Sequence, residues 1–344
     1  MPVAAFAGPV HVSHHPGTPS LRAVCRRPPR FSASAPVRRP ENAPGDLYVD
    51  SSCIDCDTCK WLAPQIFHSS HGQSAVYNQP TTPDAQLIAL QAAVACPTGS
   101  IRTTKPSRIA RDARSSFPLA MPNTLESTTV PDVFYNGFAS PDTFGGASWL
   151  VIQRGDDPCV IMFDCPRFFK PLSKAIKKMA EPLGGIRYLV LSHQDDVAGH
   201  AKWASELGAE RVIHKRECNE RQGTTACEVQ LEDANFPYTL MEGVELIHVP
   251  GHTSGSIAML HRGTQSLFTG DHIFYSQRED RLCGARYIMH SREELVKSVE
   301  KLVNIPFLHG WPGHGGHFHF SDEEDRITQI TSAVKFMRDS WKPW

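Results

Sequence analysis

The sequence predicts a layered α/β domain preceded by a small cysteine-bearing domain. Three observations support this fold class. Strand-like and helix-like segments alternate from residue 132 to the end of the 344-residue chain. Acidic and histidine side chains gather where predicted strands end, which is where α/β scaffolds present their sites. Four of the ten cysteines fall between residues 53 and 96.

The composition is that of a globular chain with no nucleic-acid or membrane partner. The formal net charge is −1, and 40% of the residues are hydrophobic. A nucleic-acid or anionic-membrane partner would call for a basic balance. No apolar run approaches the roughly 18–20 residues that span a bilayer. We therefore expect a small-molecule substrate, and an electron-donor protein as a possible partner.

The first 40 residues differ from the rest of the chain. They contain six arginines, eight prolines and no acidic residue, and the first acid is Glu41. An arginine- and serine-bearing, acid-free leader is typical of an organelle transit peptide. A disordered basic tail is the alternative. We predict a disordered transit peptide over residues 1–44 and a plastid location, with the mitochondrion as the alternative.

Three further segments follow the leader. Residues 45–104 are predicted to form the cysteine-bearing domain, and residues 132–344 the α/β domain. Residues 105–131 between them are polar and rich in proline and serine, which is typical of a linker.

Each element of the larger domain has its own signal. Residues 149–164 are two apolar runs around Gly-Asp-Asp-Pro, which predicts a hairpin. Ser291 and Glu294 have capping-box spacing, and Ser321 precedes a run of acids, so both serines are expected to begin helices. Helices are expected over 171–185, 200–210, 291–305 and 321–341, and further strands over 188–192, 211–215, 244–252, 256–260 and 266–271.

The cysteine pattern predicts one iron–sulfur cluster. Cys53, Cys56 and Cys59 are evenly spaced, and Cys96 follows after 36 intervening residues, before a proline. Three thiolates at this spacing can wrap three corners of a cubane, and a remote cysteine supplies the fourth. The same thiolates could instead bind zinc, although zinc usually uses two separated Cys-x-x-Cys knuckles. The stretches "CIDCDTCKWLAPQIF" and "ACPTGSI" resemble single-cluster bacterial-type [4Fe–4S] ferredoxins, which implies a small α+β ferredoxin-like domain.

Four histidine- and aspartate-bearing features occur in order along the larger domain. They are "SHQDDVAGH" (193–200), "VPGHTSGS" (His252), "LFTGDH" (Asp271) and "GWPGHGG" (His314). Imidazole and carboxylate groups on loops at strand ends suit zinc or iron. Asp164, at the end of the predicted hairpin, is expected to support the site rather than to bind metal.

The ordered set resembles the metallo-β-lactamase fold family, over roughly residues 132–320. This resemblance implies an αββα sandwich with metal ions at one edge of its two sheets. It also implies that His193, His252, Asp271 and His314 are metal ligands, with Asp271 in the usual bridging position.

The first motif departs from the family pattern. Asp195 stands where the family has a second histidine, and ungapped alignment puts Val197 and Ala198 where its Asp-His pair should be. Asp196 and His200 could replace that pair only through a local backbone shift. One or two metal ions therefore remain possible. Asp195 and Asp196 are the candidate catalytic carboxylates, and His200 is a candidate ligand, a supporting residue or a helix-start residue.

Three functions remain open. The resemblance favours a metal-dependent hydrolase in which a carboxylate orients or deprotonates a metal-bound water. The attached cluster domain favours an iron-dependent oxidoreductase supplied with electrons by the cluster. The change at Asp195 keeps open a redox-sensing protein with a degenerate metal site.

Overall fold

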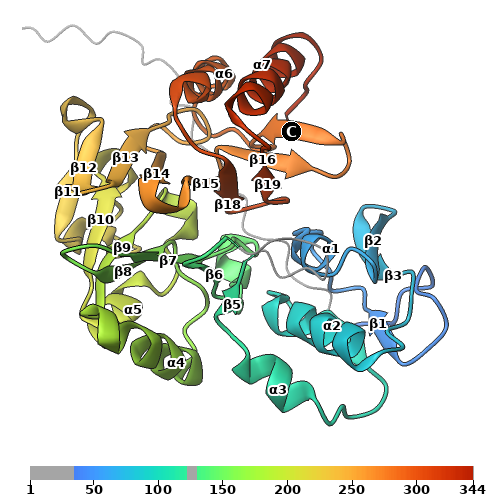
Figure 1. The fold of residues 1–344 in the computed structure, drawn as a ribbon. Coiled ribbons are helices and arrows are strands. Elements are labelled where there is room, and N and C mark those ends of the chain that lie inside the picture. Colours follow the sequence, from blue (N-terminus) through green and yellow to red (C-terminus); the bar gives the residue numbers. More distant parts are fainter. Residues whose placement is uncertain (1–34, 122–129, 344) are drawn as a thin grey trace, which may run out of the picture. The chain divides into compact units, whose positions relative to one another are not determined.

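The structure of this chain is a computed structural model that describes residues 35–121 and 130–343. The predicted leader lies mostly outside the described residues. The described residues from 36 onward form one compact unit (Figure 1). Among the described residues, no helix combines the length and the apolar character needed to cross a lipid bilayer.

The cysteine-bearing domain consists of two short antiparallel strand pairs and two helices. Helix α2 begins at Thr82, whose hydroxyl accepts a hydrogen bond from Ala85 N, and it has a proline in its first turn. It ends at Cys96, so its end delivers the fourth cysteine. The elements are β1 Leu47–Val49 paired with β4 Ile101–Thr103, β2 Phe67–Ser70 paired with β3 Gln73–Val76, α1 Thr58–Leu62 and α2 Pro83–Ala95.

This domain begins earlier than the sequence predicted. Arg38 forms a β-bridge with Asp50. Arg39 is buried and donates a hydrogen bond to Ser70 O at 2.9 Å. Asn42 is also buried. Its side-chain amide donates to Val49 O and accepts from Val49 N. The boundary at residue 44 is therefore corrected to about residue 36, because these polar side chains satisfy backbone groups inside the domain.

The segment predicted to be a linker has more structure than its composition indicated. Helix α3 (Ala110–Ser115) packs on α2, and Gln91 Nε2 donates to Ser116 Oγ at 2.9 Å. Strand β5 (Leu119–Ala120) joins the first sheet of the larger domain. Residues 122–129 lie outside the described residues. A single helical turn with one buried alanine leaves too short an apolar pattern to read from sequence.

The larger domain contains two mixed sheets. The predicted hairpin forms β7 and β8, and β8, β9 and β10 run parallel through helical crossovers. The first sheet has the order β11-β10-β9-β8-β7-β6-β5, with bounds β6 Val133–Tyr135, β7 Trp149–Gln153, β8 Cys159–Phe163, β9 Ile186–Val190, β10 Glu210–His214 and β11 Val229–Leu231.

The second sheet packs against the first through alternating side chains. Along β14, Ile257 and Met259 face the core shared with the first sheet, whereas Ala258 and Leu260 face α6 and α7. Its order is β12-β13-β14-β15-β18-β19, with bounds β12 Tyr238–Met241, β13 Val244–His248, β14 Ile257–His261, β15 Ser266–Gly270, β18 His309–Pro312 and β19 Phe318–His319; a separate hairpin pairs β16 Ile273–Ser276 with β17 Arg281–Gly284.

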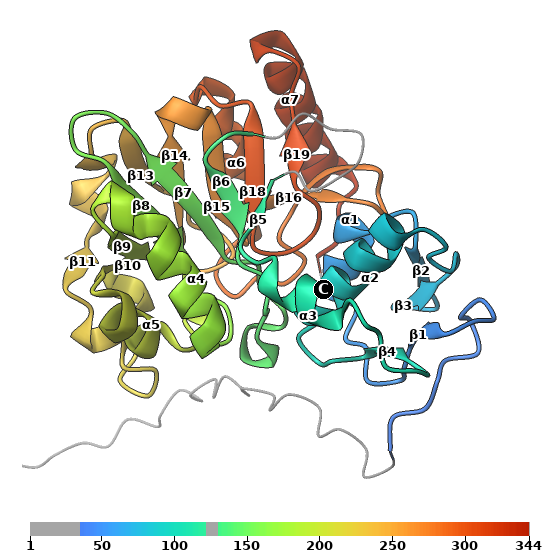
Figure 2. The ribbon, with the colours of Figure 1, turned by 60° about the horizontal axis from the view of Figure 1, so that its bottom comes forward.

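Helices cover the outer faces of both sheets, which completes an αββα sandwich (Figure 2). Helix α6 begins at Ser291 as predicted, and Ser291 accepts from Glu294 N. The last helix begins one residue later than expected, because Asp322 rather than Ser321 accepts from Asp325 N. The helices are α4 Lys170–Ala180, α5 His200–Leu207, α6 Arg292–Lys301 and α7 Glu323–Asp339, and the 3₁₀ turns are η1 Pro141–Thr143, η2 Glu181–Leu183, η3 Gln194–Asp196, η4 Lys215–Glu217, η5 Thr224–Ala226, η6 Asp233–Asn235, η7 Arg262–Thr264 and η8 Leu302–Asn304.

Aromatic side chains join the cysteine-bearing domain to the sandwich. The Trp61 ring on α1 stands edge-on to Tyr135 of β6 with ring centroids 5.0 Å apart, and 6.2 Å from the ring of Trp149 on β7. All three side chains are buried in one hydrophobic core. Burial of large aromatic surface of this kind stabilises the junction.

The buried His261 at the end of β14 gives the fold a pH dependence. Its Nε2 donates to Gln153 Oε1 at 2.8 Å and its Nδ1 accepts from Thr264 N at 3.2 Å, so the ring is neutral. Burial lowers the pKa of His261 to about 4, from about 6.5 in an unfolded chain.

Between pH 6.5 and 4 the unfolded chain therefore takes up a proton at His261 that the folded chain does not. As the pH is lowered from 6.5 to 4, the free energy of unfolding is expected to decrease, by at most about 3 kcal/mol from this group. Urea unfolding at pH 7 and pH 5 measures this decrease in the free energy of unfolding. The decrease should be smaller in His261→Gln than in the unsubstituted chain. The exposed His71→Gln should retain the full fall, and equal pH slopes for both variants would contradict this assignment.

Candidate metal centre

The four predicted metal-binding loops meet at one edge of the sandwich. His193 follows β9, His252 follows β13, Asp271 follows β15 and His314 follows β18. The loops are joined by backbone hydrogen bonds from Ile257 N to Ser192 O at 2.9 Å and from Gly313 N to Gly270 O at 2.8 Å. Strand ends therefore bring together side chains that are more than 120 residues apart in sequence.

One group of potential ligands contains His193, His252 and Asp271. Both imidazole Nε2 atoms lie 3.8 Å from Asp271 Oδ2. Asp195 adds a fourth donor, because its Oδ2 lies 3.4 Å from His252 Nε2 and 3.8 Å from His193 Nε2. Two imidazoles and two carboxylates thus surround one point.

A second group contains Asp196, Asp271 and His314. His314 Nε2 lies 3.6 Å from Asp271 Oδ2. Asp196 is the last residue of the 3₁₀ turn η3 (Gln194–Asp196), and its side chain is buried. Asp271 belongs to both groups. The six side chains therefore offer positions for two metal ions that share one carboxylate.

Hydrogen bonds orient two of the imidazoles. His193 Nδ1 lies 2.8 Å from Ser192 Oγ, and His252 Nδ1 lies 2.7 Å from Tyr287 O. A carbonyl can only accept, so His252 Nδ1 carries a proton and Nε2 is the nitrogen that faces the centre. This is the usual orientation of a metal-binding histidine.

His200 lies elsewhere. Its Nε2 lies 2.8 Å from Gln222 O, and its Nδ1 lies 3.4 Å from Arg211 Nη1. It is absent from the ligand groups found among the described residues. The prediction that His200 could be a ligand is therefore wrong. It is the first residue of α5, and its side chain turns toward Gln222.

The donor atoms of this site suit bound cations. Among the described residues, no hydrogen-bond partner is found for buried His193 Nε2, His252 Nε2, Asp271 Oδ1 or either carboxylate oxygen of Asp196. Burial raises the pKa of Asp196 well above its usual value, and the nearby Asp271 and Asp164 raise it further. Burial lowers the pKa of His193 to about 4, so its ring is neutral at pH 7. Metal ions would satisfy these atoms and neutralise the crowded carboxylates.

Two buried carboxylates hold the loops in place. Asp164 Oδ1 accepts from Ser192 N at 2.7 Å, as its expected supporting role requires. Glu217 was not recognised from sequence. Its Oε2 accepts from Gln194 N at 2.9 Å and its Oε1 from Gly255 N at 2.6 Å, so one side chain braces the loops of His193 and His252.

Replacing Glu217 by Ala is expected to weaken metal binding by about 10- to 100-fold, the usual effect of losing a group that orients ligands. Competition with a chromophoric chelator measures this loss. Glu206→Ala is the matched control, because Glu206 pairs with Lys170 and Lys177 on the surface. Equal metal affinity in both variants would show that Glu217 does not brace the loops.

A further group contains His214, Asp233 and His248. His214 Nδ1 accepts from Arg216 N at 3.1 Å, so its proton is on Nε2, which donates to Asp233 Oδ1 at 3.1 Å. The Arg216 guanidinium also pairs with Asp233. The nitrogen that faces this group therefore has no free lone pair, and the hydrogen bonds account for the three side chains without a metal ion.

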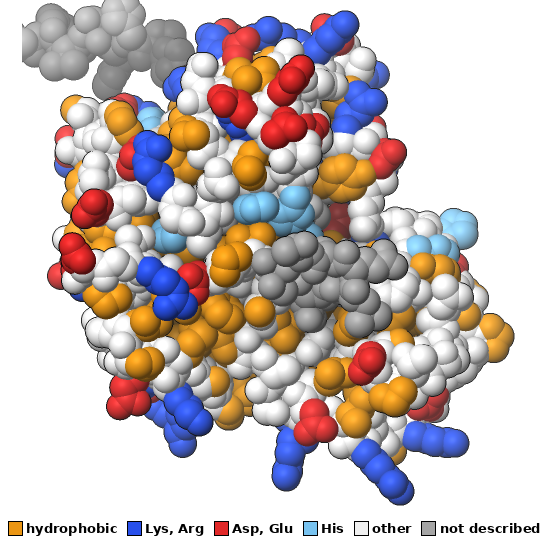
Figure 3. Space-filling view, in the orientation of Figure 1, with side chains coloured by type: hydrophobic (Ala, Val, Ile, Leu, Met, Phe, Trp, Pro, Cys, Tyr) orange, Lys and Arg blue, Asp and Glu red, His pale blue; other side chains and the backbone are white. Residues whose placement is uncertain are grey.

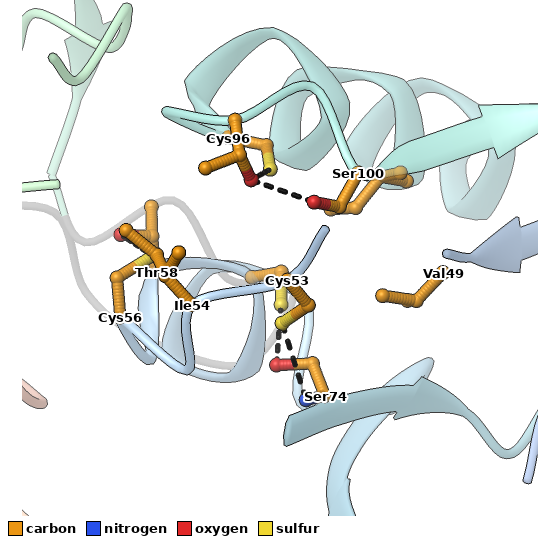
Figure 4. A pocket seen from close by; sticks show the side chains of 11 residues that line it. Val49, Cys53, Ile54, Cys56, Thr58, Ser74, Cys96 and Ser100 are labelled. Carbon is orange, nitrogen blue, oxygen red and sulfur yellow. Dashed lines mark hydrogen bonds between the residues drawn. The ribbon is translucent and has the colours of Figure 1, made fainter. Parts of the chain in front are cut away.

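The four predicted cluster ligands line one pocket of the cysteine-bearing domain (Figure 4). None of the four forms a disulfide bond. Burial raises the pKa of Cys56 to about 12, and the neighbouring Cys96 raises it further. Ser74 N lies 3.4 Å from Cys53 Sγ, and Ser74 Oγ lies 3.3 Å from Cys59 Sγ. Four crowded cysteines, one buried and three partly buried, suit a cationic iron–sulfur core.

Two family models match parts of this chain. Residues 49–103 match the 4Fe-4S single cluster domain of Ferredoxin I. Residues 143–308 match the metallo-beta-lactamase superfamily. The chain thus matches a ferredoxin domain followed by a metallo-beta-lactamase domain. The two sheets and the flanking helices of the metallo-beta-lactamase domain confirm the predicted fold class.

Two relatives of the metallo-beta-lactamase domain are hydroxyacylglutathione hydrolases. The one from Pseudomonas paraeruginosa is 33% identical over 119 residues, which are 34% of this chain and 42% of the relative. The one from Pelagibacter ubique is 22% identical over 181 residues, which are 52% of this chain and 72% of the relative. This chain thus spans less than half of the first relative's length.

The DIM-1 metallo-beta-lactamase is a similar solved structure. It is 13% identical with a TM-score of 0.44, and the match covers 59% of this chain and 94% of that chain. This likeness concerns the fold alone.

Proposed function

We propose that this chain is a metal-dependent hydrolase whose metal centre holds two ions that share Asp271. The observation that carries the proposal is the membership of Asp271 in both ligand groups, with His193 and His252 in one and Asp196 and His314 in the other. Asp195 lies beside the first group. When bound, metal ions of this kind lower the pKa of a water molecule to about 7 and polarise the bond to be cleaved.

The two candidate catalytic carboxylates have different surroundings. The Asp195 side chain is 41% exposed, so it can meet both a water molecule and a substrate. Asp196 is only 2% exposed and faces the buried part of the site. We assign Asp195 to orient and deprotonate the attacking water, and Asp196 to hold metal.

The donor set favours a hard metal ion. It contains three imidazoles and two carboxylates, with the Asp195 carboxylate beside them. Carboxylate-rich sets suit iron and manganese, whereas sets richer in nitrogen and sulfur suit zinc. We propose iron or manganese as the preferred occupant, with zinc as a working substitute.

The names of the two relatives supply the substrate class to test first. We propose hydrolysis of a small acyl substrate of the hydroxyacylglutathione type. The measurement is release of free thiol from a hydroxyacylglutathione by chain loaded with iron, manganese or zinc. No thiol release with any of the three metals would overturn this substrate class.

Asp195→Asn tests the assigned role. We expect kcat to fall by about 100- to 10,000-fold, the usual contribution of general base catalysis. Metal analysis should show both ions retained, because five other side chains hold them. An unchanged kcat would show that Asp195 does not act on the water.

The plastid location remains a proposal that rests on the arginine-rich, acid-free leader. Arg38 and Arg39 bind the backbone of the ferredoxin domain, so a mature chain should keep them. N-terminal sequencing of chain recovered from plastids is expected to place the cut before Val37. A cut after Arg39 would contradict the boundary, and recovery from mitochondria alone would contradict the location.

A further inference from the structure

Two adjacent glycines lie between the predicted cluster ligands and the metal centre. Gly145 and Gly146 are in the loop between η1 and β7. A Cβ on Gly145 would lie 2.9 Å from Cys56 Cβ and 3.1 Å from Cys56 Sγ. A Cβ on Gly146 would lie 2.6 Å from Asp196 Oδ2. One residue thus touches a cluster ligand, and the next touches a ligand of the metal centre.

This contact limits the distance between the two sites. The Cα atoms of Gly145 and Gly146 are 3.80 Å apart, as in any trans peptide. Adding the two contacts and two single-bond lengths places Cys56 Sγ within about 13 Å of Asp196 Oδ2. The true separation is shorter if the path bends. Electrons tunnel through protein over distances of this order.

The loop that makes the contact is held on both sides. Gly145 N donates to Ser140 O at 2.9 Å, and Gly146 N donates to Thr143 O at 3.0 Å. Ala147 N donates to Gly313 O at 2.7 Å, next to the ligand His314. A Cβ on Gly145 would also lie 3.0 Å from Pro97, the residue after Cys96. The loop of Gly145 and Gly146 is therefore packed both against the cluster ligands and against the metal centre.

The same junction carries the aromatic core. Trp61, two residues after the ligand Cys59, packs on Tyr135 and Trp149 of the first sheet. Gln277 Nε2 donates to Lys60 O at 3.4 Å, and Arg286 lies 3.9 Å from Asp57. These contacts fix the ferredoxin domain on the sandwich, so the short distance needs no domain movement.

We propose that Cys56, Gly145, Gly146 and Asp196 form an electron path that sets the oxidation state of the metal centre. The proposal rests on the metal centre described above, with iron as its occupant. One electron enters at the four cysteines from a one-electron donor, such as a small electron-carrier protein. It would pass from Cys56 across the two glycine peptides to Asp196, and a ferric ion held there would be reduced to ferrous. No covalent bond forms or breaks.

The first test compares two metal loadings of the whole chain. The cluster is reduced with dithionite, and its electron paramagnetic resonance is recorded with either iron or zinc in the metal centre. The paramagnetic ion should broaden the cluster signal and speed its relaxation, whereas diamagnetic zinc should leave it narrow. Identical signals in both loadings would overturn the short distance and with it the proposal.

The second test compares matched glycine variants. Gly145→Val forces a side chain into Cys56, whereas Gly155→Val lies in open space in the β7–β8 turn. Both positions have positive φ, +91° and +114°, so both variants carry similar backbone strain. One equivalent of dithionite is added, and samples are frozen at successive times. Electron paramagnetic resonance of these samples follows the reduction of the ferric centre.

We expect Gly145→Val to slow reduction of the centre by an order of magnitude or more, and Gly155→Val to leave it unchanged. Equal rates in the two variants would overturn the path, as would unchanged reduction in a Cys56→Ser chain without a cluster. If Gly145→Val does not fold, the comparison of iron and zinc loadings still tests the proposed path. Thiol release by the zinc-loaded chain is measured in parallel, so failure of the hydrolase proposal is seen separately from failure of the electron path.

Discussion

Replacing Asp271 by Ala is expected to remove both metal ions from the metallo-beta-lactamase domain in one step. Asp271 Oδ2 lies within 3.8 Å of the Nε2 atoms of His193, His252 and His314. Without this carboxylate, each ion loses a ligand and the two positions lose their shared bridge. Hydrolysis should fall to the background rate.

Metal content and absorbance measure the effect of Asp271→Ala. The iron and sulfide of the cluster should stay unchanged, because the four cysteines belong to another part of the chain. Asp156→Ala, at an exposed position in the β7–β8 turn, is the matched control and should keep both ions. Retention of one ion in Asp271→Ala would show that the two positions do not depend on a common ligand.

The second large effect is expected from Asp195→His. This change adds an imidazole beside His193 and His252, whose Nε2 atoms lie 3.8 and 3.4 Å from Asp195 Oδ2. The donor set becomes richer in nitrogen, which favours zinc over iron and manganese. Chain loaded from an equimolar mixture of the three metals should therefore shift from iron or manganese toward zinc.

Asp156→His serves as the control for Asp195→His, because it adds a histidine away from the site. Its metal ratio should match that of the unsubstituted chain. If Asp195→His also leaves the ratio unchanged, Asp195 does not contribute to metal selection. The proposed preference for iron or manganese would then lose its chemical basis.

Much of the fold could be predicted from local sequence signals. The hairpin of β7 and β8 and the start of α6 at Ser291 appear where turn and capping residues placed them. Four histidine and aspartate side chains, each after a predicted strand, indicated a common site, and the resemblance to the metallo-β-lactamase fold implied that it lies at one edge of a sandwich. These signals are local, and the strand ends then bring distant residues together.

Other features depend on tertiary contacts that a single sequence does not show. Asp196 faces inward because its turn is held by Glu217, whose carboxylate accepts from Gln194 N from 23 residues away. Arg39 belongs to the ferredoxin domain because it bonds a backbone carbonyl 31 residues on. His200 has metal-binding chemistry, but helix α5 directs it toward Gln222. Residue type and spacing alone do not distinguish these cases.

The most direct measurement of the whole account is a count of metal and sulfide per chain after purification without oxygen. One [4Fe–4S] cluster contributes four irons and four acid-labile sulfides. The account predicts these and, in addition, two further ions of iron or manganese, or of zinc after zinc loading. Four irons, four sulfides and no other metal, even after loading, would contradict the central claim that Asp271 is shared by two metal ions.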